Sequence, residues 1–322
     1  MTSLNIVHLD RQSIGPAITL AKPETAHDWT SYDFTEPHQV IDRLHDADIA
    51  IINKVKLDAQ TLAQLPRLKM IAISATGFDK VDHNACRDRG IVVSNIRGYA
   101  KTTVPEHTFA LILALRRAIK GYTMDVTAGE WQNTKQFCLF TQPVSDLRGA
   151  TLGLIGSGAI GGAVAKIAQA FGMQVLIAAR KGASDIPQGY TAFDDVLEQA
   201  DVLTLHCPLT PQTTNLIATP EFARMKDSAI IINTSRGGLV NEDDVITALD
   251  QGMIAGAGFD VVTTEPPKAD HIFMQNLHRP NFILTPHTGW ASDEAMQILW
   301  DQLIGHIDSF AQGSPQNDVT QG

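Results

Sequence analysis

Short apolar segments recur along the first hundred residues and alternate with stretches of mixed polarity. Residues 6–9, 49–52, 70–74 and 91–93 are rich in aliphatic side chains and have the length of buried strands. The patterned stretches between them predict helices, and repeated βα units imply a parallel sheet. No glycine-rich turn follows the first of these strands, so we assign this part of the chain to a substrate and not to a dinucleotide.

A long helix is predicted over residues 103–120. Thr103 and Glu106 have the spacing of a capping box, and Pro105 lies in the first turn, where its missing N–H costs little. Apolar side chains over residues 109–115 cover most of the circumference, which requires burial on several sides. A domain junction or a subunit interface would provide that burial.

A second series of strands and helices begins at Thr151. Six strands are predicted, at residues 152–155, 175–178, 202–205, 229–232, 255–259 and 282–284. Six is the strand count of a doubly wound nucleotide-binding domain. A last helix is predicted after Ala291 and is expected to pack on the first domain, whereas the polar tail over residues 314–322 is expected to fray.

These patterns predict an α/β protein with two doubly wound parallel-sheet domains. We expect a Rossmann nucleotide-binding domain over residues 102–290, inserted into a flavodoxin-like substrate domain formed by residues 1–101 and 291–322. The composition agrees with two domains, because a chain of 322 residues that is 44% hydrophobic and 19% charged can bury two cores.

The net charge, the cysteines and the N-terminal residues argue against several classes of protein. A net charge of −10 opposes binding to nucleic acid or to an anionic membrane surface, so we expect neither as a partner. Cys86, Cys138 and Cys207 are odd in number and far apart, which fits neither a disulfide framework nor a thiolate metal site. The first ten residues lack the features of a signal peptide, and no apolar run approaches the roughly 20 residues that span a bilayer. We therefore expect an unprocessed cytoplasmic protein.

A glycine motif follows the first strand of the second series. Gly156, Gly158 and Gly161 have the spacing G-x-G-x-x-G between that strand and the next helix. The first glycine allows a tight turn, the second lets the backbone approach a pyrophosphate, and the third lets helix and strand pack closely. The helix N-terminus then supplies donors to phosphate oxygens. The motif predicts a dinucleotide site.

The residues after the second strand of this series indicate which dinucleotide is used. NAD-binding proteins place a carboxylate here for the ribose 2'-hydroxyl, but this chain has Ala179, followed by Arg180 and Lys181. The alanine removes repulsion of a 2'-phosphate, and the two cations can pair with it. We expect NADP(H) to be preferred and NAD(H) to be possible. The alternative is that both cations are solvated and the loop does not discriminate.

Polar residues follow the later strands of the second series, at residues 233–238, 256–261, 264–267 and 285–290. In an open α/β sheet this edge binds ligands. With residues 75–79, 95–100, 104–107 and 206–210, these segments make the chain resemble the D-isomer-specific 2-hydroxyacid dehydrogenases. Within that family it is similar to the glycerate dehydrogenase branch, which comprises hydroxypyruvate and glyoxylate reductases. The resemblance covers nearly the whole chain.

The resemblance implies a catalytic set of Arg236, Glu265 and His287. Reduction of a 2-oxo acid builds negative charge on the C2 oxygen, which a cation such as Arg236 would stabilise. An imidazole such as that of His287, with a reference pKa of about 6.5, suits proton donation at neutral pH, and Glu265 would orient it. No metal is needed for this chemistry. The resemblance also implies that the substrate is bound by Arg236, by His287 and by backbone amides around Thr76 and Gly77, which anchor its carboxylate.

The cofactor site is expected to include further residues beyond the glycine motif and the two cations. Asp260 is implied to lie near the nicotinamide amide, whereas His206 and Cys207 are expected to line the pocket without reacting. The cofactor-binding residues expected on these grounds are Gly156, Ser157, Gly158, Ala159, Ile160, Gly161, Arg180, Lys181, His206, Cys207, Pro208, Thr213, Thr234, Ser235, Asp260, His287 and Gly289.

The expected function is reduction of a small 2-oxo acid, hydroxypyruvate or glyoxylate in the first place, to the D-2-hydroxy acid with NADPH. One alternative is a D-3-phosphoglycerate dehydrogenase-like enzyme. Another is a nucleotide-regulated binding protein, like the related C-terminal-binding corepressors. A homodimer is expected from the apolar helix and the arm after it, in which Trp131 either reaches the partner's substrate pocket or packs in the interface.

Overall fold

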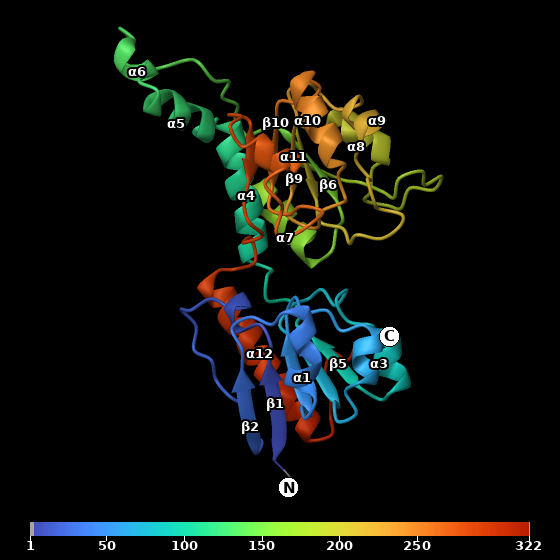
Figure 1. Ribbon diagram of the computed structural model, residues 1–322. Coiled ribbons are helices and arrows are strands. Elements are labelled where there is room, and N and C mark those ends of the chain that lie inside the picture. Colours follow the sequence, from blue (N-terminus) through green and yellow to red (C-terminus); the bar gives the residue numbers. More distant parts are fainter. Residues whose placement is uncertain (1–2, 322) are drawn as a thin grey trace. The chain divides into compact units, whose positions relative to one another are not determined.

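Two compact units make up the chain in the computed structural model, which describes residues 3–321 (Figure 1). Unit 1 comprises Met1–Ala100 and Ala291–Gly322, and unit 2 comprises Lys101–Trp290. Each unit contains one parallel sheet with helices packed on it. The expectation of an α/β protein with two parallel sheets is confirmed.

Unit 1 has a five-stranded parallel sheet in the order β2-β1-β3-β4-β5, which is the flavodoxin-like order. Its strands are β1 (Leu4–His8), β2 (His27–Ser31), β3 (Ile49–Ile52), β4 (Met70–Ile73) and β5 (Val92–Asn95). Its helices are α1 (Val40–Leu44), α2 (Ala59–Ala63), α3 (His83–Asp88) and α12 (Asp293–Ala311), with 3₁₀ turns at Arg11–Ser13 and Pro37–Gln39. The helix α12 packs on this sheet, as predicted, and its buried Trp300 ring contacts the rings of His8 and Trp29.

Two features of unit 1 differ from the sequence-based expectation. The edge strand β2 was not predicted, because its five residues are mostly polar and partly exposed, so they show no apolar run. The C-terminal tail does not fray over its described part. Asp318 pairs with Ser94 in an antiparallel bridge, and the Val319 N–H donates to the Val93 carbonyl. The tail thereby satisfies backbone groups along the open edge of β5, which the polarity of the tail does not reveal.

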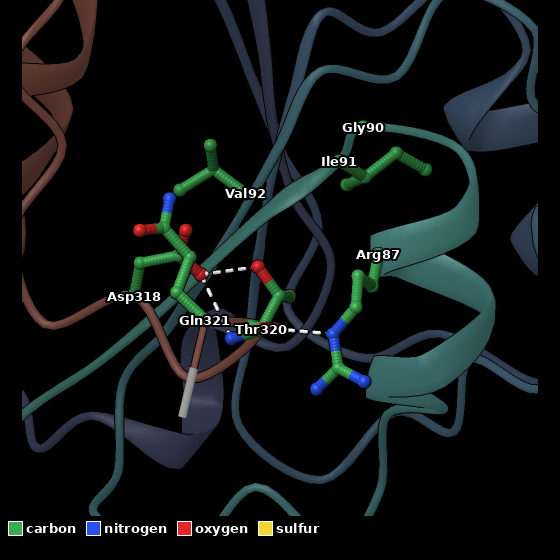
Figure 2. Close-up of a pocket in the computed structure, with 7 residues that line it drawn as sticks. All are labelled: Arg87, Gly90, Ile91, Val92, Asp318, Thr320 and Gln321. Atoms are coloured by element: carbon green, nitrogen blue, oxygen red, sulfur yellow. Dashed lines mark hydrogen bonds between the residues drawn. The ribbon is translucent and has the colours of Figure 1, made fainter.

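The last described residues of the tail also border a hollow beside β5. Figure 2 shows its lining, in which the Arg87 side chain donates to the Thr320 carbonyl and Asp318 accepts from the Thr320 hydroxyl. These bonds tie the tail to the end of α3. The hollow therefore belongs to the packing of the chain end in unit 1.

Unit 2 has a six-stranded parallel sheet in the order β11-β10-β9-β8-β6-β7. Its strands are β6 (Thr151–Ile155), β7 (Gln174–Ile177), β8 (Val202–Leu205), β9 (Ile230–Asn233), β10 (Gly256–Phe259) and β11 (Phe282–Leu284). Its helices are α4 (Thr103–Arg116), α5 (Ile119–Thr127), α6 (Glu130–Asn133), α7 (Ala159–Ala170), α8 (Phe193–Gln199), α9 (Thr219–Phe222), α10 (Glu242–Asp250) and α11 (Ile272–Gln275). The strand order reverses at β6, because β7 lies on one side of it and β8 on the other. Ligands of open α/β sheets bind at such a switch point.

The predicted helix over residues 103–120 is two helices. It breaks after α4 because Ala118 has a left-handed backbone, with φ of 49°, and α5 starts in a new direction. The predicted capping box is wrong, since no side chain caps α4 and the Thr103 hydroxyl donates instead to the Gly289 carbonyl. The helix α4 packs on the sheet and on α7, whereas α5 and α6 extend away from the sheet as an arm (Figure 1).

The described helices do not include one of the length and apolar character needed to cross a membrane. Among residues 3–321 there is also no group of three or more His, Cys, Asp and Glu side chains arranged to hold a metal ion.

Candidate active site

The three proposed catalytic residues follow three adjacent strands of unit 2. Arg236 lies just beyond β9, Glu265 in the loop after β10, and His287 just beyond β11. Since these strands are parallel neighbours, their carboxyl ends lie at one edge of the sheet. The fold thus brings the loops that bear all three side chains to the same edge.

His287 and Glu265 form a hydrogen-bonded pair. The Nδ1 atom of His287 lies 2.7 Å from Oε2 of Glu265, and both side chains are partly buried. An ionised carboxylate can only accept, so Nδ1 is the donor, and the Nε2 atom has no partner among the described residues. The second carboxylate oxygen, Oε1, accepts the Val262 N–H at 3.2 Å. Glu265 therefore fixes the ring of His287 and leaves its Nε2 atom for proton exchange.

A buried carboxylate organises the turn that presents His287. The Oδ1 atom of Asp260 accepts the Thr285 hydroxyl at 2.6 Å and the Thr288 N–H at 3.0 Å, and its Oδ2 atom accepts the Gly289 N–H at 2.8 Å. A Cβ atom at position 289 would lie 2.8 Å from that Oδ2 atom. Within this turn His287 has a left-handed backbone, with φ of 55°. Asp260 thus acts on the turn, and its oxygens are engaged within the protein.

The pKa of Asp260 is held below its usual value by these contacts. Burial alone would raise the pKa, but hydrogen bonds from His107, Thr285 and the two backbone amides outweigh that effect. His107 lies on α4, with its Nε2 atom 2.9 Å from the Thr285 hydroxyl and 3.4 Å from Oδ1 of Asp260. Its role was missed from the sequence, although it ends one of the recognised segments, because the contact joins residues far apart in the chain.

The loop of Arg236 packs directly against the chain that leads to Glu265. A Cβ atom at Gly237 would lie 2.1 Å from the carbonyl of Val262, so only glycine fits there. Arg236 itself is exposed, and its Nη1 atom donates to the Ser235 carbonyl at 2.8 Å. Asn233 shapes this loop, because its Nδ2 atom donates to the Arg236 carbonyl and its Oδ1 atom accepts the Ser235 N–H.

The glycine motif lies at the switch point between β6 and β8. Gly156 has φ of 97°, and a Cβ atom there would lie 2.6 Å from the His206 carbonyl and 2.7 Å from the Cys207 nitrogen. A Cβ atom at Gly161 would lie 2.0 Å from the Gly156 oxygen, whereas one at Gly158 would meet nothing within 4 Å. Gly158 caps α7, so open space lies beside the N-terminus of a twelve-residue helix. This geometry fits a pyrophosphate.

One neighbour of the glycine motif, Tyr190, was not foreseen. The Ser157 hydroxyl lies 2.7 Å from the Tyr190 hydroxyl, and Tyr190 precedes Thr191, which forms a parallel bridge with Ala178 beyond the end of β7. Ala179 is buried and donates its N–H to the Thr191 carbonyl. Tyr190 is in a loop without a motif, so no signal in the sequence marks it.

The two cations after β7 differ in their environment. The Lys181 ammonium lies 2.8 Å from Oε1 of Glu221, whose side chain is almost completely buried. Arg180 is exposed, and its guanidinium has no hydrogen bond or ion pair with any described residue. Lys181 is therefore engaged in an ion pair with Glu221, whereas the guanidinium of Arg180 is unpaired among the described residues.

The remaining expected cofactor residues are engaged in local structure or buried. His206 bonds to the Thr204 hydroxyl, and burial lowers its pKa to about 4, so its ring is neutral at pH 7. Burial raises the pKa of Cys207, which keeps the thiol protonated. The hydroxyl of Thr213 donates to Pro208, that of Thr234 pairs with Thr108, and that of Ser235 donates to Cys207.

Thr76 and Gly77, the expected carboxylate anchors, belong to unit 1. They follow β4, and the Thr76 hydroxyl donates to the Ile96 carbonyl at 2.8 Å while its own carbonyl accepts from Asn95. These bonds join the turns after β4 and β5, two adjacent strands of the sheet. The turn is thereby held at the carboxyl edge of the unit 1 sheet.

Comparison with known proteins gives concordant matches. Residues 109–289 match the family described as D-isomer specific 2-hydroxyacid dehydrogenase, NAD binding domain. The chain is 50% identical over 317 residues to glycerate dehydrogenase of Methylorubrum extorquens, which covers 98% of each chain. It is 38% identical to hydroxypyruvate reductase of Blautia hydrogenotrophica over 89% of each. A crystal structure of a protein from Thermus thermophilus matches with a TM-score of 0.84 and 30% identity, covering 98% of this chain and 100% of that one.

Proposed function

The chain belongs to the D-isomer-specific 2-hydroxyacid dehydrogenases, which are NAD(P)-dependent oxidoreductases that act on the CH–OH group. From this premise we propose that it reduces hydroxypyruvate or glyoxylate with NADPH. The proposal assigns His287 as the proton donor, Glu265 as its orienting carboxylate and Arg236 as the cation that binds the substrate. The observation that carries it is the 2.7 Å bond between His287 Nδ1 and Glu265 Oε2 at the sheet edge that also bears the Arg236 loop.

The proposed roles follow from the charge that develops during reduction. When bound, the nicotinamide supplies a hydride to C2 of the 2-oxo acid. Arg236 stabilises the negative charge on the C2 oxygen and binds the carboxylate, and the Nε2 atom of His287 donates the proton that completes the alcohol. Glu265 stabilises the charged ring and holds its orientation. In the oxidative direction the same Nε2 atom removes the hydroxyl proton.

The substrate and its anchors are proposed from the relatives. Glycerate dehydrogenase and hydroxypyruvate reductase are the names of two similar proteins, which favours a three-carbon 2-oxo acid with a terminal hydroxyl. The backbone amides around Thr76 and Gly77 are the proposed anchors for its carboxylate, and unit 1 is accordingly the proposed substrate-binding domain.

NADPH is favoured over NADH by the environment after β7. Ala179 offers no carboxylate to a ribose 2'-hydroxyl, and the guanidinium of Arg180, unpaired among the described residues, can meet a 2'-phosphate with two parallel bonds. The glycine motif would hold the pyrophosphate at the N-terminus of α7. Asp260, whose oxygens are used by the His287 turn, would influence the nicotinamide through that turn.

A homodimer is proposed from the arm of unit 2. The segment after α4 leaves large apolar side chains in solvent, with Phe137 90% and Phe140 85% exposed, and Ile119, Met124 and Trp131 also exposed. An apolar surface of this kind marks an interface. A second copy of the chain is the proposed occupant, since the arm extends away from its own sheet (Figure 1).

The proposal is tested by initial rates with hydroxypyruvate, glyoxylate, pyruvate and 3-phosphohydroxypyruvate, each with NADPH and with NADH. We expect the highest kcat/KM for hydroxypyruvate or glyoxylate with NADPH. A highest value for 3-phosphohydroxypyruvate would replace the proposed substrate with a phosphorylated one. No turnover of any pair, with intact NADPH binding, would favour a nucleotide-regulated binding protein.

A further inference from the structure

The carboxylate that orients His287 is supplied by a loop and not by a helix or strand. Residues 260–271 connect β10 to α11 without regular structure, and residues 263–266 lie at the surface, with the Glu265 side chain partly buried. A loop of this kind has little packing of its own to hold a side chain within the fraction of an ångström that catalysis requires. Contacts from outside the loop must therefore supply the rigidity around Glu265.

Glu242 makes two such contacts, one on each side of Glu265. Its Oε1 atom accepts the Thr263 N–H at 2.7 Å, and its Oε2 atom lies 3.0 Å from Nε2 of His271. Thr263 precedes Glu265 by two residues, and His271 follows it by six. The side chains of Glu242 and His271 are only 13% and 15% exposed, so the bond between them is shielded from water. One carboxylate thus joins both ends of the loop.

The two hydrogen bonds of the His271 ring determine which of its nitrogen atoms carries the proton. Its Nδ1 atom accepts the Phe273 N–H at 3.2 Å at the start of α11, so the ring proton lies on Nε2 and is donated to Glu242. Phe273 is completely buried and stacks obliquely on Phe259 of β10. The histidine is therefore held between a packed helix and the carboxylate.

Glu242 itself is held by a rigid element. It is the first residue of α10, whose Asn241 cap accepts the Asp244 N–H and whose buried face includes Val245 and Ile246. A carboxylate is also favoured at a helix N-terminus by the helix dipole. The fold thus anchors the Glu265 loop to α10, while the close contact at Gly237 holds Val262 on the other side.

We propose that Glu242 is a positioning residue for the reaction, which clamps the loop through Thr263 and His271 so that Glu265 meets His287. The inference rests on the proposed role of Glu265. It does not require Glu242 to touch substrate or cofactor. Loss of the clamp lowers kcat, because the fraction of molecules with a correctly held imidazole falls, and leaves the binding of NADPH unchanged.

The central test is a double-mutant cycle between Glu242→Gln and Glu265→Gln, read as kcat for the preferred 2-oxo acid. The Glu242→Gln side chain keeps an acceptor for Thr263 but presents an amide to the His271 N–H, so kcat is expected to fall about tenfold, with an unchanged Kd for NADPH. In the Glu265→Gln background the same change is expected to alter kcat by less than about twofold, since the group it positions is gone.

The matched control is Asp243→Asn, an exposed acid in the same helical turn whose side chain has no bond to the loop, and it is expected to keep wild-type kcat. His271→Gln, which can still offer an N–H near the Nε2 position, is expected to retain more activity than His271→Ala.

Wild-type kcat in Glu242→Gln would overturn the clamp while leaving the proposed function intact. Fully additive losses in the cycle would assign Glu242 a merely structural role. An unimpaired Glu265→Gln enzyme would instead reject the catalytic pair itself, and the clamp with it.

Discussion

His287 has a backbone conformation that is uncommon for a residue with a side chain. Its φ of 55° lies in the left-handed region, which histidine and asparagine tolerate better than most residues. The hydrogen bonds that Asp260 accepts from Thr285, Thr288 and Gly289 hold the turn in this conformation. These hydrogen bonds offset the conformational cost of the left-handed backbone, and the turn thereby places the His287 imidazole against Glu265.

Replacing His287 by asparagine separates the chemistry of the ring from the strain of the turn. His287→Asn is expected to lower kcat by a factor on the order of 10² to 10⁴, the usual contribution of a general acid. Thermal unfolding should change little, because asparagine tolerates positive φ. His278→Ala, at an exposed position of the same unit, is the control. Near-normal turnover of His287→Asn at neutral pH would remove the ring from the mechanism.

Arg180 is the residue on which the proposed preference for NADPH depends. Arg180→Ala is expected to lower kcat/KM for NADPH roughly 10- to 100-fold. The reason is the loss of charge-assisted hydrogen bonds to the 2'-phosphate, which contribute about 1.5–3 kcal/mol. The value for NADH should change by less than about threefold. Arg224→Ala, an exposed arginine paired with Asp194 and Glu198, is the matched control. Equal losses with both cofactors would contradict a bond to the 2'-phosphate.

At the scale of elements, the glycines at the turn between β6 and α7 have two different roles, since one is required by packing and another lies beside open space. A methyl group at Gly158 meets no atom within 4 Å, whereas one at Gly161 would clash with the Gly156 oxygen at 2.0 Å. Gly162, in the same helix, also has open space around it. An added methyl group at Gly158 can therefore test the proposed pyrophosphate site without disturbing the fold, and Gly162 provides the control.

Three alanine substitutions test this division. Gly158→Ala is expected to raise the Kd for NADPH at least about tenfold with little change in Tm, because its methyl group obstructs the pyrophosphate. Gly161→Ala is expected to destabilise the protein by about 1–3 kcal/mol through overpacking. Gly162→Ala should stabilise α7 by up to about 1 kcal/mol. Normal NADPH affinity in Gly158→Ala, measured by fluorescence titration, would place the pyrophosphate elsewhere.

At the scale of the whole molecule, the exposed arm predicts the oligomeric state. Light scattering at micromolar concentration should give the mass of a dimer, and combined Phe137→Ser and Phe140→Ser substitutions should shift it toward the monomer, because the interface loses two large apolar side chains. Phe34→Ser, at a position 62% exposed in unit 1, is the control and should remain dimeric. A monomeric wild-type protein would contradict the proposed assembly.

Acid stability is predicted from His8, whose side chain is completely buried in unit 1. Burial, assisted by the charge of Arg11, lowers its pKa to about 4. The unfolded chain therefore binds more protons between about pH 6.5 and pH 4, so stability is present above this window and falls as the pH decreases through it. The slope from this one group reaches about 1.4 kcal/mol per pH unit.

Urea denaturation at pH 7 and pH 5 measures this effect. The wild-type protein is expected to lose stability between the two values, and His8→Phe, which has no titrating group, is expected to lose less. Asp10, 3.9 Å from His8, has a pKa raised by burial and contributes in the opposite direction, so the comparison of the two proteins isolates the histidine. Equal losses in both would exclude His8 as the cause.

The sequence by itself determined the strands other than β2, the glycine motif and the family. Apolar runs mark buried strands because both faces of a parallel sheet are covered, and the observed limits of these strands lie within two residues of those predicted. The G-x-G-x-x-G spacing marks a turn whose geometry excludes other residues. The resemblance to the D-isomer-specific 2-hydroxyacid dehydrogenases, drawn from short motifs, is confirmed. All these signals are local in the chain.

Only the tertiary structure decided which side chains are available for chemistry. Lys181 is adjacent to Arg180 in sequence, but its pairing with Glu221, which is distant in the chain, sets it apart from its neighbour. The hydrogen bond between Glu242 and His271 likewise joins the first residue of α10 to the residue that caps α11, and no common motif marks the two. Such contacts depend on how the strands and helices pack, and the free energy of a buried polar group depends on the partner that packing brings to it.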